Sequence, residues 1–229
     1  MASSSNTLFV IGSGPGIGRS VTTLFATKRY SKIALIARRA EQLSVEQKAV
    51  EDVVGSEVQI KTYAVDVVDS EALLKALDDA ESALGRPECV FYNAARVLPS
   101  QLLSHEVKDI EYDFKINVSA LYVVAQRFIP QLTQLAQEDA SALPALIVTS
   151  SMLPQHPIPF LFALSLVKAA QRNLVQSLSM TYESILIGLI NVGGQVSPDA
   201  EVHNPTNIAA KAWEWYSQSK EQKSFEVLI

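Results

Sequence analysis

The segment GSGPGIG, residues 12–18, holds glycines at a spacing that could serve a phosphate-bearing ligand. It directly follows the apolar run TLFVI and opens a stretch with helical periodicity. Glycine permits a tight turn and a close approach of the backbone to a ligand, while the N-terminus of a helix offers free N–H groups and a positive dipole end. The context favours a dinucleotide-binding turn over a flexible loop, with contacts at Gly12, Ser13, Gly14, Gly16, Ile17 and Gly18.

The end of the next apolar run indicates which dinucleotide would fit. Residues 32–37, KIALIA, are followed by Arg38 and Arg39, and no carboxylate stands there. A carboxylate would accept hydrogen bonds from an adenosine ribose, whereas a guanidinium can hold a 2′-phosphate. We therefore expect NADP(H) with Arg38 as a ligand, although both arginines could instead be solvated surface charges. Asp66, after a third apolar run, could accept from the adenine amino group or cap a helix.

Short apolar runs alternate with helical periods along the whole chain. We predict strands at residues 7–12, 32–37, 58–67, 88–94, 145–151, 185–192 and 224–229. We predict helices from the glycine turn to residue 30 and at residues 41–54, 70–84, 105–137, 160–182 and 206–217. Such alternation is typical of a parallel sheet covered on both faces. We expect a single α/β domain over residues 1–229, a doubly wound, mostly parallel seven-stranded sheet of the Rossmann type, whose ligands bind beyond the carboxyl ends of the strands.

Bulk composition excludes several classes of function. The 229 residues carry a net charge of −5 with a sequence pI of about 5.3 and no basic stripe, so we expect no nucleic-acid partner. Cys89 is the single cysteine, which excludes an internal disulfide and a multi-cysteine metal site and suits a reducing compartment. We expect no metal. The chain begins with a short polar tag rather than a signal peptide, and no stretch is long and apolar enough to span a membrane, so we expect a cytoplasmic protein.

Several motifs in order resemble the short-chain dehydrogenase/reductase family, and the resemblance covers essentially the whole chain. GSGPGIG is similar to the family's glycine motif, YNAA at residues 92–95 to its Asn-Asn-Ala-Gly motif, and FKINVSALYVV at residues 114–124 to the helix with its catalytic asparagine. IVTSS at residues 147–151 is similar to the strand with the catalytic serine, and LSLVKAA at residues 164–170 to the Tyr-x-x-x-Lys helix. The resemblance implies catalytic roles for Asn117, Ser151 and Lys168, and cofactor contacts at Val67, Asn93, Ala94 and Lys168.

The sequence departs from that family's pattern in three places. Leu164 stands where the family has its tyrosine, the general acid that gives a proton to the carbonyl oxygen as hydride reaches the carbon. Leucine cannot donate a proton, and loss of such a group typically costs about 10²–10⁴ in rate. Gly193-Gly194 replaces the family's Pro-Gly, which we expect to leave the backbone loose. About ten residues separate Gly194 from the helix near residue 205, so we expect a very short lid segment and an open substrate side.

A substitute proton donor is expected on the loop MLPQHPIPF, residues 152–160. His156 lies there between prolines that stiffen the backbone, and histidine titrates near neutral pH. The alternative is that His156 is a solvated surface group, with Ser151 or a bound water supplying the proton instead.

Three functions remain open, of which we expect the first. It is an atypical NADP(H)-dependent oxidoreductase that acts on a small, apolar organic molecule with a substitute proton donor. The second is a non-redox catalyst, an isomerase or cyclase, with the dinucleotide as part of its site, and the third is a non-catalytic NADP(H)-binding protein. The resemblance also implies a two-fold packing of helices, and the apolar runs at residues 120–129 and 174–180 lead us to expect a homodimer or homotetramer.

Overall fold

The computed structural model describes residues 6–221 and 223–229, so all but the last residue of the polar tag predicted at residues 1–6 lies outside the described residues. Strands and helices alternate along the chain. The strands are β1 (Thr7–Ile11), β2 (Lys32–Ala37), β3 (Gln59–Ala64), β4 (Cys89–Tyr92), β5 (Ala145–Ser151), β6 (Leu186–Val192) and β7 (Glu226–Leu228). The helical elements are α1 (Ile17–Lys28), α2 (Ala40–Val54), α3 (Ser70–Leu84), α4 (Val107–Phe114), the π-helical turn η1 (Lys115–Ser119), α5 (Ala120–Glu138), α6 (Phe162–Thr181) and α7 (Pro205–Ser217).

The seven described strands form one parallel sheet in the order β3-β2-β1-β4-β5-β6-β7. The predicted doubly wound, Rossmann-type fold is therefore confirmed. The chain leaves β1 toward β2 and β3 on one side, and β4 then begins the other half of the sheet beside β1. A crevice forms at such a switch point because the connections that leave β1 and β4 run in opposite directions.

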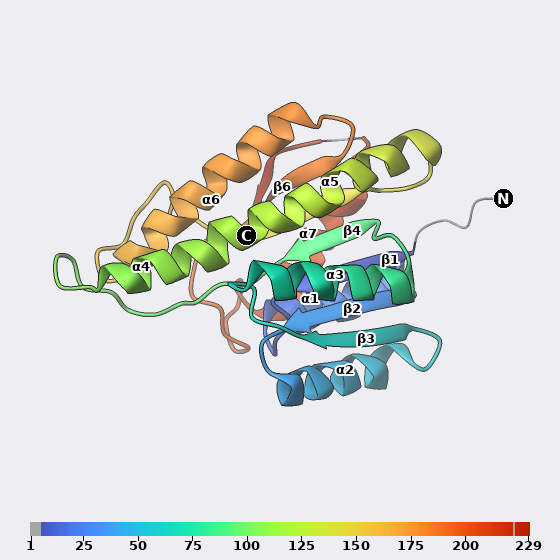
Figure 1. Ribbon diagram of the computed structural model, residues 1–229, viewed down its shortest axis with the longest axis horizontal. Coiled ribbons are helices and arrows are strands. Elements are labelled where there is room, and N and C mark those ends of the chain that lie inside the picture. Colours follow the sequence, from blue (N-terminus) through green and yellow to red (C-terminus); the bar gives the residue numbers. More distant parts are fainter. Residues whose placement is uncertain (1–5, 222) are drawn as a thin grey trace.

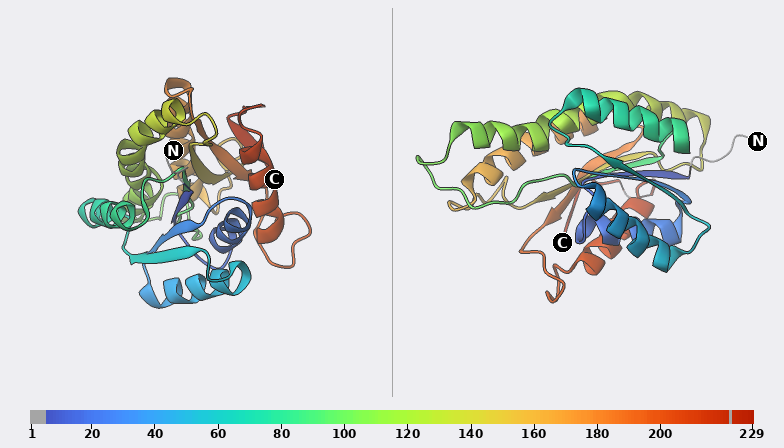
Figure 2. Two further views of the ribbon diagram at one scale, coloured as in Figure 1. Left: turned by 90° about the vertical axis from the view of Figure 1, so that its right-hand side faces the viewer. Right: turned by 60° about the horizontal axis from the view of Figure 1, so that its bottom comes forward.

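Helices cover both faces of the sheet, as Figures 1 and 2 show. One apolar core packs the sheet against α3, α5 and α6, with Leu73, Val124 and Val175 among its buried side chains. The other packs the opposite face against α1, α2 and α7, with Val21 and Val50 among its members. Strands that are buried on both faces have continuously apolar sequences. This is why the strands could be predicted from the sequence.

The predicted elements are mostly too long where the chain approaches the crevice. The strand predicted at residues 58–67 ends at Ala64, and the strand predicted at 88–94 ends at Tyr92. Residues 65–67 and 93–94 follow these strands and line a cavity, while the N–H groups of Val65 and Asn93 still donate to the carbonyl oxygens of Ala37 and Ile11. The helix predicted at residues 105–137 is divided into α4 and α5 by η1. At η1, which contains Asn117, the helix adopts a wider π-helical turn.

Candidate active site

A cavity lies beyond the carboxyl ends of β1, β2 and β4. It has a volume of about 240 Å³, and the glycine turn, the end of β2 and the segments after β3 and β4 surround it. The lining residues are Gly12, Ser13, Gly14, Pro15, Ala37, Arg38, Arg39, Gln42, Val65, Asp66, Val67, Asn93, Ala94, Ala95 and Ile116. Most of the predicted cofactor contacts are thus brought together, whereas Gly16, Ile17, Gly18 and Lys168 are not among the lining residues.

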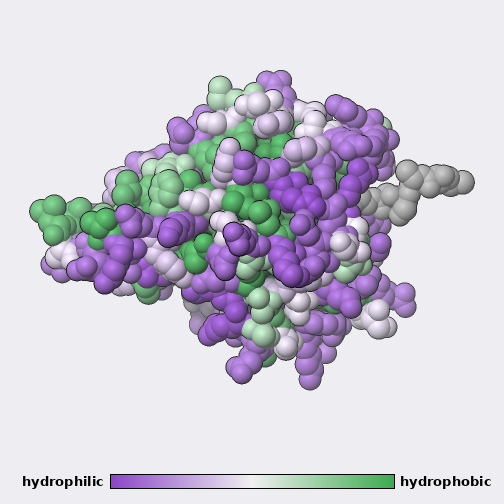
Figure 3. Space-filling model, viewed as in Figure 1, coloured by the Kyte–Doolittle hydropathy of each residue, from purple (hydrophilic) through white to green (hydrophobic). Residues whose placement is uncertain are grey.

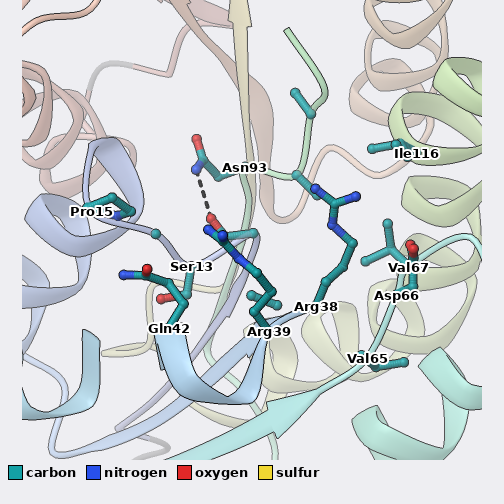
Figure 4. Close-up of a pocket in the computed structure, with 15 residues that line it drawn as sticks. Ser13, Pro15, Arg38, Arg39, Gln42, Val65, Asp66, Val67, Asn93 and Ile116 are labelled. Carbon is teal, nitrogen blue, oxygen red and sulfur yellow. Dashed lines mark hydrogen bonds between the residues drawn. The ribbon is translucent and has the colours of Figure 1, made fainter. Parts of the chain in front are cut away.

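Gly12 allows the glycine turn to pack against the segment that follows β4. Its φ is +91°, and a Cβ at this position would lie 2.4 Å from the backbone nitrogen of Ala94. The side-chain amide of Asn93 donates to the carbonyl oxygen of Gly12 at 3.0 Å, as the dashed line in Figure 4 shows. Only glycine combines this backbone conformation with this close approach, so Gly12 is required by the fold of the turn itself.

Gly14 and Gly16 have a different role, because a Cβ on either would meet no atom within 4 Å. Space is thus left over the N-terminus of α1, which has no side-chain cap and no acidic residue in its first turn. The Oγ of Ser13 is buried there and has no hydrogen-bond partner. Free N–H groups, an uncompensated dipole end and an unpartnered hydroxyl fit the pyrophosphate of a dinucleotide.

Arg38 and Arg39 differ from the other six arginines of the chain, all of which lie in the described residues. Each of the others forms an ion pair with a carboxylate. Neither Arg38 nor Arg39 forms an ion pair with any of the described residues. Both side chains extend from the end of β2 toward the cavity, Arg39 on the side of Ser13 and Gln42 and Arg38 on the side of Asp66 and Val67 (Figure 4). Two exposed guanidinium groups without a protein partner form a suitable site for a phosphate group.

Asp66 lines the cavity and does not cap a helix. The N-cap of α3 is Asp69, whose carboxylate accepts from the backbone nitrogen of Ala72 at 3.0 Å. The Asp66 carboxylate accepts from the backbone nitrogen of Val68 at 3.2 Å and from the hydroxyl of Tyr112 at 3.2 Å. The helix-cap alternative for Asp66 is therefore wrong, and its carboxylate is available to a ligand in the cavity.

The three polar residues that the family motifs mark as catalytic lie around the carboxyl end of β5. Ser151 ends that strand, and its Oγ accepts from the backbone nitrogen of Leu153 at 3.3 Å. Asn117 is fully buried in η1, where its amide nitrogen donates to the carbonyl oxygen of Asp113 at 2.9 Å and its Oδ1 has no partner. Lys168 is 7% exposed on α6. None of the three lines the cavity described above.

The amine of Lys168 is bound entirely by neutral groups of the protein. Its Nζ donates to the carbonyl oxygen of Thr149 at 2.9 Å and to Oε1 of Gln171 at 2.8 Å. Burial lowers the pKa of Lys168 to about 7, because a charged amine loses its hydration while no carboxylate compensates for that loss. Lys168 thus loses its proton much more readily than an ordinary surface lysine does.

Leu164 stands one helical turn before Lys168 and belongs to a small apolar cluster. The cluster consists of Leu153, Leu164 and Val167, with Leu161 packed against it. Leu164 is 5% exposed. Leu164 and its neighbours are therefore all apolar, and the assignment of this position to the family's proton donor remains a prediction.

His156 lies on the exposed surface of the turn after β5. Its backbone nitrogen donates to the carbonyl oxygen of Met152 at 2.8 Å. Within the described part of the chain, its imidazole forms no hydrogen bond with Ser151 or Lys168. The substitute-donor role of His156 remains a prediction.

The segment after β6 corrects the expectation of a loose backbone at Gly193-Gly194. The Gly193 N–H donates to the carbonyl oxygen of Ile229 at 2.7 Å, a bond that proline could not make. The ring of His203 lies against Gly194, so that a Cβ there would be 2.4 Å from its Nδ1. These glycines are needed because the C-terminal strand and the short segment of residues 193–204 fold back onto the end of β6.

Comparisons with known proteins identify the family. Residues 6–204 match the family model described as short chain dehydrogenase. The chain belongs to this short-chain dehydrogenase family. The fold agrees with solved structures of similar length. An alcohol dehydrogenase from the archaeon Thermococcus sibiricus, complexed with 5-hydroxy-NADP, has 17% identity and a TM-score of 0.84, with 97% of this chain and 95% of that chain covered.

One further solved structure and two proteins compared by sequence are similar to this short-chain dehydrogenase. A short chain oxidoreductase from Pseudomonas aeruginosa PAO1, described as containing an atypical catalytic center, has 17% identity and a TM-score of 0.84, with 99% and 97% of the two chains covered. Human 17-beta-hydroxysteroid dehydrogenase 13 is 29% identical over 128 residues, which is 56% of this chain and 41% of that protein. The 3-dehydrosphinganine reductase TSC10A of Arabidopsis thaliana is 25% identical over 124 residues, 54% of this chain and 36% of that protein. The matched segments thus span about two fifths of the length of these relatives.

Sequence reasoning missed several residues of the site. Arg39 and Gln42 also line the cavity. Their closeness to Arg38 along the chain was the only feature of the sequence that could have indicated this. Gln171 contacts Lys168, and its spacing of three residues on the same helix could have indicated this contact. Nothing in the sequence pairs His203 with Gly194. Within the described residues, no three His, Cys, Asp or Glu side chains are grouped so that they could hold a metal ion, and no helix has the length and apolar character needed to cross a membrane.

Proposed function

We propose that this short-chain dehydrogenase binds NADP(H) and is an atypical oxidoreductase for a small, apolar organic molecule. The observation that carries the proposal is the cavity at the uncapped N-terminus of α1, into which Arg38 and Arg39 extend without an ion pair. The glycine turn would hold the pyrophosphate, and the guanidinium groups would hold the 2′-phosphate. Asp66 would accept from the adenine amino group. When bound, the dinucleotide supplies or accepts a hydride.

Exposed apolar side chains on the loops after β4 and before α6 support an apolar substrate. Val97, Leu98 and Leu102 after β4, and Phe160 before α6, are all more than half exposed. The two loops are joined because Ser100 donates its N–H to the carbonyl oxygen of Phe160 at 2.8 Å and accepts from the N–H of Ala163 at 3.1 Å. Figure 3 shows hydrophobic surface gathered at the projecting end of the molecule that these loops form with α4. Contiguous exposed apolar surface of this kind is typical of a binding site.

Isothermal titration calorimetry with NADPH and NADH tests the cofactor assignment. We expect NADPH to bind at least about tenfold more tightly than NADH, since a charge-assisted phosphate contact contributes about 1.5–3 kcal/mol. Arg38→Ala should remove most of this preference. Arg86→Ala is the matched control, because Arg86 pairs with Glu138 away from the cavity. Equal affinity for the two dinucleotides, unchanged in Arg38→Ala, would contradict the assignment.

A non-redox catalyst, an isomerase or cyclase, is the second candidate, favoured by the apolar surroundings of Leu164. Hydride transfer builds negative charge on a carbonyl oxygen, and Leu164 offers that oxygen no proton. His156, Ser151 or a water would have to supply it. If neither role holds, the chain is a non-catalytic NADP(H)-binding protein. Absorbance at 340 nm during conversion of a substrate separates these functions, because only the oxidoreductase changes the redox state of the dinucleotide.

Assembly and location remain predictions. Most apolar side chains at residues 120–129 pack inside the molecule, among them Leu121, Val124 and Phe128, whereas Tyr122 is 48% and Met180 72% exposed. These two exposed residues support the proposed homodimer or homotetramer. Cys89 is buried and unpaired, which agrees with a cytoplasmic location. Light scattering at micromolar concentration measures the assembly directly.

A further inference from the structure

Gln171 is a buried polar residue that links two parts of the candidate active site. Its side chain has no solvent exposure. Its Nε2 donates to the carbonyl oxygen of Asn117 at 2.9 Å, and its Oε1 accepts from Nζ of Lys168 at 2.8 Å. One amide thus connects α6 with η1, and both of its polar atoms have a partner. A fully satisfied polar group in a core specifies a single arrangement of its neighbours.

The π turn matters for this link because it places a backbone acceptor opposite α6. A π turn widens a helix locally and is frequent at functional sites. In η1 the carbonyl oxygen of Asn117 accepts a hydrogen bond from a different helix, which α-helical carbonyls inside a core rarely do. The position of Lys168 therefore depends on η1 through Gln171, and on β5 through the carbonyl oxygen of Thr149.

The charged groups on the elements around α6 are exposed or bonded to residues other than Lys168. β5 and β6 carry no titratable side chain, and the only one in η1 is the exposed Lys115. On α4, Asp113 is bonded to Arg96 at 2.6 Å. Arg172 on α6 pairs with Glu226 of β7. Lys168 consequently has neutral partners only, and burial holds its pKa near 7.

The residue type at position 171 affects whether the Lys168 amine is charged. A glutamate would offer Lys168 a negative charge and favour the ammonium form, whereas an apolar residue would leave Asn117 and Lys168 with one partner fewer. Glutamine alone supplies a neutral acceptor to the amine and a donor to the π turn. We propose that Gln171 is a positioning residue of the active site, whose amide holds the Lys168 amine at the end of β5 with uncharged partners.

The role as an active-site residue rests on the proposed function. The hydrogen bonds to Thr149 and Gln171 require only two N–H groups of the amine and can form in both of its protonation states.

Titration of Lys168 in the ligand-free protein tests the positioning role without any turnover. The Cε resonance of Lys168, assigned with Lys168→Met, should titrate near neutral pH in the wild type. Gln171→Glu should raise that midpoint by at least about one pH unit, because it places a carboxylate beside the amine. Gln176→Glu is the control, since it adds the same charge to an exposed position of α6. Gln171→Met keeps the volume, removes both hydrogen bonds, and should lower the midpoint.

Calorimetric titration with NADPH completes the experiment. A wild-type midpoint above about pH 10, or equal midpoints in Gln171→Glu and Gln176→Glu, would overturn the positioning role. If NADPH fails to bind while the midpoints shift as expected, the proposed function is wrong and the positioning role of Gln171 stands.

Discussion

The two halves of the crevice of this short-chain dehydrogenase use different means to define a site. The cavity between the glycine turn and β2 is built from backbone groups and from arginines that have no protein partner. The other half, at the end of β5, is built from side chains that already satisfy one another or pack in an apolar cluster. The first half is prepared for an anionic ligand, whereas in the second the expected proton donor is a buried leucine. The two halves can therefore be tested separately by substitution.

Blocking the first half should have the largest effect on ligand binding. Gly14→Val adds a side chain where the protein itself leaves space, so the free energy of unfolding should change little. The same side chain would occupy the space over the N-terminus of α1, and NADPH affinity should fall at least about a hundredfold. Thermal unfolding and calorimetry measure the two quantities on one sample. Tight NADPH binding by Gly14→Val would mean that the dinucleotide lies elsewhere.

Restoring the hydroxyl tests the second half. Leu164→Tyr should increase NADPH-dependent reduction of a small test ketone by about a hundredfold, the lower end for general acid catalysis, with Lys168 one turn away to lower the phenol pKa. Leu164→Phe is the matched control, because it introduces the same ring without the hydroxyl group that donates the proton. Both rings must displace part of the leucine cluster, so we expect a modest loss of stability in each.

Two outcomes would change the comparison between the halves. An equal gain in Leu164→Phe would assign the effect to the shape of the site rather than to a proton. Wild-type reduction as fast as in ordinary family members would mean that another group, with His156 first, already donates.

The last expected effect concerns stability rather than function. Because the pKa of Lys168 is about 7 in the folded protein against 10.5 for an unperturbed lysine, the unfolded chain binds more protons between these values. The wild type should therefore gain stability over Lys168→Met as pH rises from 7 toward 10.5, by at most about 1.4 kcal/mol per pH unit. Urea unfolding of both proteins at several pH values measures this difference. A constant difference would show that the amine stays protonated in the fold.

Much of the binding half could be predicted from the sequence because its signals are local. A glycine turn between an apolar run and a helical period has a restricted set of conformations, and the two arginines directly follow β2. The predictions of seven parallel strands and of Asp66 beside the cavity follow from short-range patterns of the same kind. Strand ends were placed too far along because apolar residues past β3 and β4 line the cavity as readily as they extend a strand.

The sequence by itself was enough to place the seven apolar runs that form strands and the glycine turn between the first strand and its helix. It also showed that position 164 holds a leucine rather than a tyrosine. Each of these features depends on residues that are close along the chain. Only the tertiary structure decided the state of Lys168, which depends on a strand carbonyl at Thr149 and on an amide that reaches the π turn of another helix. It also decided that Gly193 is held by the C-terminal residue and Gly194 by His203. Such contacts join segments far apart in sequence, and hydrogen bonding and burial at these points act only after the chain has folded.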